Sequence, residues 1–467
     1  MKKILLVLVM LAGAAYARPG GGHSFSGGHS YSSHSYSHSY SGGHYSSGHY
    51  HGGPADPIAM LVVLGLVLVI AVIVQIIRQR GETTFTSGRV SPLAAVPQVR
   101  QDLYNLKSDD PDFSRAVFED FAYRLYAEAR RFGGARVARY FAPGALAKLT
   151  EPADQVVIGT LRVVGSRVVA AENQLIVHYE ANLSRGKRTQ YAVERWYFYR
   201  AHGVHTKPPQ TRAWPCPSCG APWEGDAPTT CASCGQTITP GRFDWAVSDM
   251  AIESIENVGK TLTGTVDEVG NDFPTVRDPA ADTRLRELSS DDAGVTWQAF
   301  QERAAMIYGR LNSAWNASDL GPVRGLVTRS LLDYLRYWLD EYRRQGLRNH
   351  LDRAELQNLE LAKVDRDRYF DAITVRVRAT GLDYTVNDSG KVVGGSQKRP
   401  RPYSEYWTFL RSSARRGPIV TDPRCPNCGA PLEISDSGTC THCDAELERG
   451  SFDWVLSKIE QDDVYAG

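Results

Sequence analysis

The chain has 467 residues, 42% of them hydrophobic, and its 53 basic and 52 acidic residues give a formal net charge of +1. This length allows two to four domains with hydrophobic cores of their own. The balanced charge argues against a protein that coats nucleic acid without sequence preference. The charge is unevenly placed, because residues 1–77 carry only four charged side chains. We therefore expect residues 1–77 to be associated with a membrane and the rest of the chain to be soluble and globular.

The N-terminus has the pattern of a secretory signal peptide. Lys2 and Lys3 precede the apolar run Ile4–Ala15, which ends in Ala-Tyr-Ala at 15–17. We predict a signal peptide at 1–17, with an uncleaved signal anchor as the alternative. Residues 18–57, rich in Gly, Ser, His and Tyr, cannot bury enough apolar surface to fold and are predicted to be disordered. Their seven histidines form either a loose transition-metal site or a plain spacer.

A transmembrane helix is predicted at 58–77. Ile58–Ile77 contains no charged residue, and twenty helical residues span about 30 Å, the thickness of a bilayer core. Arg78 and Arg80 follow at once, so the positive-inside rule places this end in the cytoplasm. We expect a single-pass protein of the plasma (bacterial inner) membrane, with its N-terminal segment outside, a juxtamembrane linker at 78–111, and all later domains in the cytoplasm.

All eight cysteines fall into two clusters with one shared spacing, C-x2-C-x11-C-x2-C, and both contain the sequence Cys-Pro-x-Cys-Gly-Ala-Pro. They are Cys216, Cys219, Cys231 and Cys234, then Cys425, Cys428, Cys440 and Cys443. Two C-x2-C turns supply four thiolates to one tetrahedron, which predicts two zinc ribbons with one structural zinc ion each. Disulfides do not suit a reducing compartment, and mononuclear iron remains an alternative. His442 is expected to be an idle neighbour.

An internal repeat extends beyond the cysteines. Glu194-Arg195-Trp196 and Glu405-Tyr406-Trp407 precede the two ribbons, and Gly-x-Phe-Asp-Trp follows each of them, ending at Trp245 and Trp454. We expect the Phe and Trp of each tail to pack the ribbon onto its domain. The predicted boundaries are 112–205 for the first α+β copy, 206–250 for its ribbon and tail, 251–293 for a connector, 294–412 for the second copy, and 413–467 for its ribbon and tail.

Apolar periodicity predicts the elements of the second copy. Helical spacing covers Trp297–Trp315 and, after a break, about Pro322–Gln345. Alternation at 373–379 predicts a strand whose Thr374, Arg376 and Arg378 face water. Further strands are predicted at Tyr403–Arg411 and Gln357–Val364, with a hairpin turn at 387–390. Helices followed by an antiparallel meander indicate an α+β fold.

The first copy is more diverged but follows the same plan. A helix is predicted over Phe113–Leu125, and strands are predicted at Val156–Val164, Gln174–Ala181 and Thr189–Arg200. A long second helix is missing, and Ala135–Leu149 is interpreted as its short remnant.

The second copy resembles the Tim44-like domain family. The resemblance is carried by Ala314-Trp315 with Asp319-Leu320, the helix Leu326–Leu339, Asn349, and Glu405-Tyr406-Trp407-Thr408-Phe409. It covers residues 295–412 and, more weakly, 112–200. It implies cone-like α+β domains with a concave apolar sheet face. The family is named for the mitochondrial inner-membrane anchor of the protein-import motor, which tethers a chaperone and contacts lipid and translocating chains.

Three functions are compatible with the sequence. The first is a membrane-tethered adaptor that binds a peptide, a lipid or a partner protein in an apolar groove, with membrane lipids around its helix and a protein partner in or at the membrane. The second is an enzyme using Asp383 or Glu405, which we do not expect because no catalytic constellation is recognisable. The third is nucleic-acid binding through the ribbons, next to the basic stretches Lys398–Arg401 and 411–424. We expect the adaptor.

Overall fold

A computed structural model describes residues 98–149, 151–169, 171–186, 188–209, 214–223, 229–257, 270–420, 424–425, 427–431, 433–435, 439–445, 450–462, 465 and 467. The predicted signal peptide, low-complexity segment and membrane span lie outside these residues. Within the described part of the chain, no helix is both long and apolar enough to cross a membrane.

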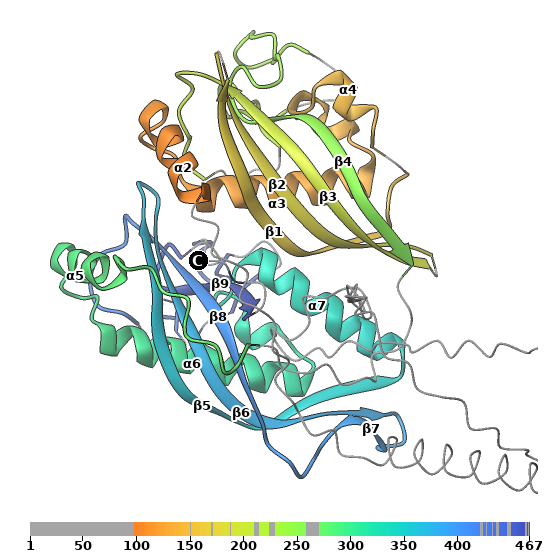
Figure 1. The fold of residues 1–467 in the computed structure, drawn as a ribbon, viewed down its shortest axis with the longest axis vertical. Helices are drawn as coiled ribbons and strands as arrows, with labels where there is room; N and C mark the ends of the chain where they lie inside the picture. The colour runs from red at the N-terminus through yellow and green to blue at the C-terminus, as the bar shows by residue number, and fades with distance from the viewer. Residues whose placement is uncertain are drawn as a thin grey trace, which may run out of the picture. The chain divides into compact units, whose positions relative to one another are not determined.

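The first domain combines helices with one antiparallel sheet whose strands follow in chain order, β1-β2-β3-β4 (Figure 1). Helix α3 packs across one face of this sheet, and the cysteine segment lies in the chain between β3 and β4. The elements are α2 (Gln98–Asp109), α3 (Arg115–Phe132), η1 (Ala135–Tyr140), α4 (Pro143–Leu146), β1 (Gln155–Val169), β2 (Glu172–Arg185), β3 (Arg188–Ala201) and β4 (Ala246–Asn257).

The second domain repeats this order with an additional long helix. Its sheet has the antiparallel order β5-β6-β8-β9, and the short β7 pairs with β6 (Figure 1). The elements are α5 (Ala281–Asp291), α6 (Trp297–Ala317), η2 (Gly321–Val323), α7 (Arg329–Arg344), β5 (Leu347–Arg366), β6 (Phe370–Asn387), β7 (Val392–Gly395), β8 (Arg401–Ser412) and β9 (Val455–Gln461).

The α+β class with two antiparallel sheets is confirmed, whereas the cone shape stays a prediction. The two tails that follow the ribbons are strands β4 and β9, which hydrogen-bond to β3 and β8. The segment expected to be a connector, 251–293, contains the end of β4 and helix α5, and the expected linker at 78–111 contains α2.

Helix α7 begins at Arg329, seven residues later than its apolar periodicity predicted. Gly325 adopts a left-handed φ of 76°, which interrupts a helix, and the N–H of Thr328 donates to the carbonyl of Leu456 on β9 at 2.9 Å. Leu326 and Val327 are therefore buried by pairing with the last strand rather than by a helical stripe.

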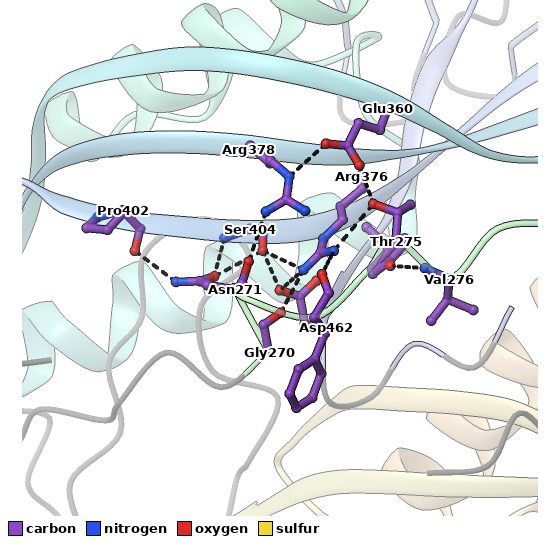
Figure 2. Close-up of polar contacts among 12 residues, drawn as sticks. Gly270, Asn271, Thr275, Val276, Glu360, Arg376, Arg378, Pro402, Ser404 and Asp462 are labelled. Carbon is purple, nitrogen blue, oxygen red and sulfur yellow. Dashed lines mark hydrogen bonds and ion pairs between the residues drawn. The ribbon is translucent and has the colours of Figure 1, made fainter. Parts of the chain in front are cut away.

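The prediction that one face of β6 is wet is wrong. Arg376 is 0% exposed because residues 270–276 cross the outer face of the sheet there (Figure 2), and Thr374, 5% exposed, bonds to Thr408, while Arg378 is half-buried. The Arg376 guanidinium donates to the carbonyls of Phe273 at 2.6 Å and Gly270 at 2.7 Å, and it pairs with the Asp462 carboxylate at 2.9 Å. A buried arginine is tolerated here because its charge is paired with Asp462 and both of its terminal nitrogens have acceptors, although its buried Nε–H has none among the described residues.

Each domain is tied to its tail by a buried Asp–Arg pair under a tryptophan. In the first domain, Arg200 pairs with Asp110 at 2.7 Å and lies 4.5 Å from the ring centroid of Trp245. In the second, Arg411 pairs with Asp292 at 3.1 Å and lies 5.9 Å from Trp454. In each domain, the aspartate lies in the loop before the long helix, the arginine lies near the end of a central strand, and the tryptophan follows the ribbon.

An aromatic contact next to each pair repeats in the same way. Phe118 lies 5.2 Å from Trp245 and 5.3 Å from Phe198, while Phe300 lies 5.4 Å from Trp454 and 5.3 Å from Phe409 (ring centroids). Hydrophobic periodicity gives no sign of the Asp–Arg pairs, although Ser-Asp-Asp recurs at 108–110 and 290–292.

Replacing Asp292 by Ala should lower the free energy of unfolding of the second domain by up to about 3–5 kcal/mol, because it removes the carboxylate that is hydrogen-bonded to the buried Arg411 guanidinium and leaves only the field of Asp453 to offset that charge. Urea denaturation of the full-length protein in detergent, followed at the second domain by amide hydrogen exchange, would measure this loss.

The matched control is Asp291→Ala, one residue earlier, whose ion pair with Arg366 is half exposed and should be worth about 0–1 kcal/mol. Burial alone would raise the pKa of Asp292, but the N–H groups of Gly417 and Gly294 and the Arg411 guanidinium lower it. The contribution of Asp292 is therefore present above the pKa of an unfolded Asp, about 4, and fades as the pH falls further. Equal losses from both substitutions would contradict the role of the buried pair.

Candidate metal centres

Each Cys-x-x-Cys pair forms one tight turn closed by two backbone hydrogen bonds. In the first turn, the N–H of Cys216 donates to Ala221 O at 2.8 Å and the N–H of Gly220 donates to Cys216 O at 2.9 Å. The other three turns have the same bonds. The residue after the second cysteine is left-handed in all four turns, with φ of 75°, 67°, 73° and 57° at Gly220, Gly235, Gly429 and Asp444. Glycine, or less often Asp, suits this conformation.

The four sulfurs of each cluster converge, with all ligand atoms within 4.8 Å of one another. The Cys219–Cys231, Cys425–Cys443 and Cys428–Cys440 sulfurs are 3.9, 3.8 and 3.9 Å apart. A tetrahedral ion with metal–sulfur bonds of about 2.3 Å requires sulfur separations of about 3.8 Å. A disulfide would need about 2.05 Å, and all eight cysteines are free thiols. The geometry therefore suits zinc in both clusters.

In each cluster the pKa of one thiol is lowered, while the pKa of a neighbouring thiol, Cys216 or Cys428, is raised to about 12. A hydrogen bond from the backbone N–H of Cys234 lowers the pKa of Cys231 to about 6. The side-chain amide of Asn427, 3.4 Å from the Cys443 sulfur, lowers the pKa of that thiol to about 6. Thiolates are the metal-binding form of cysteine, so these two positions favour capture of a cation.

In the tail after each ribbon, the phenylalanine packs against the ribbon and the tryptophan packs against the domain. Phe243 packs on the small core of Cys216, Cys231 and Ile238, and Phe452 does the same against Cys425 and Cys440. Two residues later, Trp245 and Trp454 are buried in the cores of their domains. Phe-Asp-Trp thus works as a two-sided brace, as the sequence predicted.

His442 does not join the second cluster. Its side chain is 44% exposed, and its Nε2 lies 3.8 Å from a Glu433 carboxylate oxygen. Among the described residues, only the two cysteine groups bring three or more His, Cys, Asp or Glu ligand atoms together.

The carboxylates considered for catalysis are held inside the fold. Glu405 is buried and accepts a hydrogen bond from the indole N–H of Trp407 at 2.9 Å. Glu194 accepts the equivalent bond from Trp196 at 2.8 Å and pairs with Arg130. Asp383 is buried and accepts from the Asn349 amide at 3.0 Å. These contacts explain the shared Glu-x-Trp motif as a structural element.

The sheet face expected to line an apolar groove is occupied by the second domain's own helices. Val375, Val377, Trp407 and Phe409 are at most 2% exposed and pack in one cluster with α6 and α7. A depression of about 270 Å³ lies instead between the end of α6 and α7, lined by Ser318, Asp319, Leu320, Gly321, Arg324, Arg336, Leu339, Asp340 and Arg343. Its lining is charged rather than apolar, and Arg343 pairs with Asp340 at 2.6 Å.

The basic stretch beside the second ribbon is interrupted by burial. Arg401 and Arg411 are 3% and 1% exposed and pair with Asp383 and Asp292. Neither guanidinium can reach a phosphate backbone without breaking its pair, which removes two of the cations that favoured nucleic-acid binding.

Comparison with known proteins identifies a domain of the Tim44-like class. A model of the Tim44-like domain family matches residues 281–419, which run from α5 to beyond β8. The resemblance of the second copy to this family is confirmed. The first domain and both cysteine clusters lie outside the match. No curated protein matches the chain.

The full-length protein should contain two zinc ions per chain, because both clusters supply four convergent thiols. Cys425→Ser should reduce this to one ion and lose the structure of the second ribbon, since the binding free energy of a closed site is folding free energy. Elemental analysis of the purified protein would measure the metal content. His442→Ala is the control and should retain two ions; a loss in this variant would place His442 among the ligands.

Phe452→Ala and Trp454→Ala should have different effects. The first removes the apolar cover of the second cluster and should weaken zinc binding about 10–100-fold, as measured by competition with a chromophoric chelator. The second leaves a cavity in the domain core and should cost about 3–5 kcal/mol in urea denaturation while the protein retains two zinc ions. The same defect in both variants would contradict the division of roles.

Proposed function

We propose that this protein is a membrane-tethered, zinc-stabilised adaptor whose α+β domains bind a protein partner at the cytoplasmic side of the membrane, in protein transport or membrane-protein assembly. The observation that carries the proposal is the Tim44-like domain at residues 281–419. The family resemblance supports a binding role, because its mitochondrial member joins a membrane to a chaperone and to translocating chains.

The site chemistry favours binding over catalysis. Closed four-thiol sites leave no coordination position for water or substrate, so zinc held there stabilises structure. Glu405 and Asp383 are committed to internal hydrogen bonds, and His178, His350 and His442 lie on β2, β5 and the second ribbon, in different parts of the chain. We assign the eight cysteines as zinc ligands and no residue as catalytic.

The tether is the predicted span Ile58–Ile77, followed by Arg78 and Arg80. Its length and its uncharged sequence match a bilayer core, and the two arginines orient the following domains toward the cytoplasm. The cytoplasm would also keep the eight thiols reduced and available to metal.

Crosslinking the tagged full-length protein in its native membrane, followed by mass spectrometry, tests the proposal. We expect a translocase, an insertase or a chaperone to be enriched, and this enrichment to fall when Cys425→Ser and Cys428→Ser remove the second ribbon. Extraction at alkaline pH should leave the protein in the membrane fraction.

The outcome has three alternatives. Recovery of lipid or a small molecule without any protein would favour ligand binding instead. Recovery of nucleic acid with a steep salt dependence would favour the ribbons as a nucleic-acid surface. Complete release of the protein at alkaline pH would contradict the tether.

A further inference from the structure

The depression between the end of α6 and α7 has one wall formed by a single face of α7. Spacings of three and four residues bring together on this face Arg336, Leu339, Asp340 and Arg343. The opposite wall is the chain that leaves α6, residues 318–324. The depression therefore lies entirely within the described part of the second domain.

The wall that follows α6 contains a residue in a strained backbone conformation. Ser318 has a φ of 53°, in the left-handed region that Gly or Asn usually occupies at the end of a helix. The next residue, Asp319, accepts a hydrogen bond from the N–H of Gly321 at 2.9 Å and fixes the turn. Residues held in this region of φ cost free energy and cluster at functional sites.

The lining of the depression carries one net positive charge. It contains Arg324, Arg336 and Arg343 against Asp319 and Asp340. A carboxylate carries one negative charge at neutral pH, whereas a phosphate monoester carries nearly two. The balance of charge therefore suits a carboxylate better than a phosphate, and the planar guanidinium group matches the two oxygens of a carboxylate.

Two of the three arginines are held only by exposed ion pairs on their own helix. Arg343 Nη1 lies 2.6 Å from Asp340, and Arg336 Nη1 lies 3.3 Å from Asp333. These side chains are between 40% and 66% exposed, so each pair is worth about 0–1 kcal/mol. The Nε and Nη2 groups of both arginines have no acceptor in the described part of the chain. A ligand can therefore bind them without breaking a buried pair.

The third arginine connects the depression with the second ribbon. Arg324 Nη1 donates to the Ile434 carbonyl at 3.3 Å, and Ile434 packs on the small core of Cys425 and Cys440. The position of Arg324 thus depends on the folded ribbon, whereas the two arginines of α7 are placed by their helix. The contribution of the α7 arginines can therefore be tested with the ribbon intact.

We propose that this depression binds a carboxylate of a protein partner, with Arg336 and Arg343 as its charged contacts. Leu320 and Leu339, which are 8% and 7% exposed, would contact an apolar group next to the carboxylate. The carboxylate belongs either to an acidic side chain or to the C-terminus of the partner. The inference rests on the proposed adaptor function, and it names the surface of the Tim44-like domain that the partner contacts.

Isothermal titration of the full-length protein in a non-ionic detergent tests the site directly. One probe is the peptide Gly-Glu-Leu-Gly with an acetylated start and an amidated end, and the other is acetylated Gly-Gly-Leu with a free C-terminal carboxylate. We expect saturable binding of at least one peptide, and no binding after Glu is replaced by Gln or the free end is amidated. The peptide that binds identifies the source of the carboxylate.

Three variants separate the site from general electrostatics. The double substitution Arg336→Gln and Arg343→Gln should weaken the bound peptide at least about tenfold, because it removes both charge-assisted contacts. The control Arg344→Gln removes an equal charge from the neighbouring position, which pairs with Glu341 outside the depression, and should change affinity less than about twofold. Asp340→Asn should tighten binding at least about threefold, because it removes the carboxylate that competes for Arg343.

A gain of affinity cannot arise from a variant that fails to fold, so Asp340→Asn keeps the test decisive. Absence of binding by the unaltered protein would overturn the proposal, as would binding that the double variant retains or that Asp340→Asn weakens. Inorganic phosphate that displaces the peptide at a lower concentration than acetate would overturn it by assigning the depression to a phosphate group.

Crosslinking in the native membrane separates this inference from the adaptor function. Partner enrichment that persists in the double Gln variant would overturn the assignment of this surface and leave the adaptor function in place. No enrichment with the unaltered protein would contradict the adaptor function and, with it, the protein origin of the carboxylate, whatever the peptide titration shows.

Discussion

The buried ion pair of Asp110 and Arg200, with its counterpart Asp292 and Arg411, is the constraint on which each domain depends. It joins a helix entrance, a central strand and the residue that follows the ribbon, three segments far apart in sequence. Two charges without water are acceptable only when they meet in good geometry, so each pair fixes where the ribbon leaves and rejoins its sheet. The cysteine clusters, the Phe-Asp-Trp brace and the final strand are all placed relative to this point.

The elements that follow a simple period could be predicted from sequence, and the contacts between distant segments could not. Apolar residues three to four apart predicted α6 well, and alternation located β6 and β8, because burial on one side controls those patterns. The same rule failed for Arg376, whose outward position on the strand is covered by residues about a hundred positions away. It failed again before α7, where Leu326 and Val327 are buried because this segment pairs with the last strand, β9.

The cysteine clusters were the most predictable part of the candidate site, since metal geometry requires ligands at fixed short spacings. Their braces were predictable from the repeat of Phe-Asp-Trp. The Asp–Arg pairs were not, because a charged residue in a sequence gives no sign of being buried unless its partner is known. Comparing the two copies residue by residue supplies that information, since positions kept in both domains mark the contacts that the fold requires.

The insertion of each ribbon before the last strand of its sheet has a consequence for assembly. Ala201 and Ala246 end and begin neighbouring strands, yet the whole cysteine segment lies between them. Until the four thiols are gathered, the chain must close a long loop to place β4, and the entropy of that closure opposes folding. A bound ion shortens the loop in effect, so metal binding would favour completion of the sheet. In a cell starved of zinc, newly made chains would expose the open edge of β3, and such edges invite pairing with other chains.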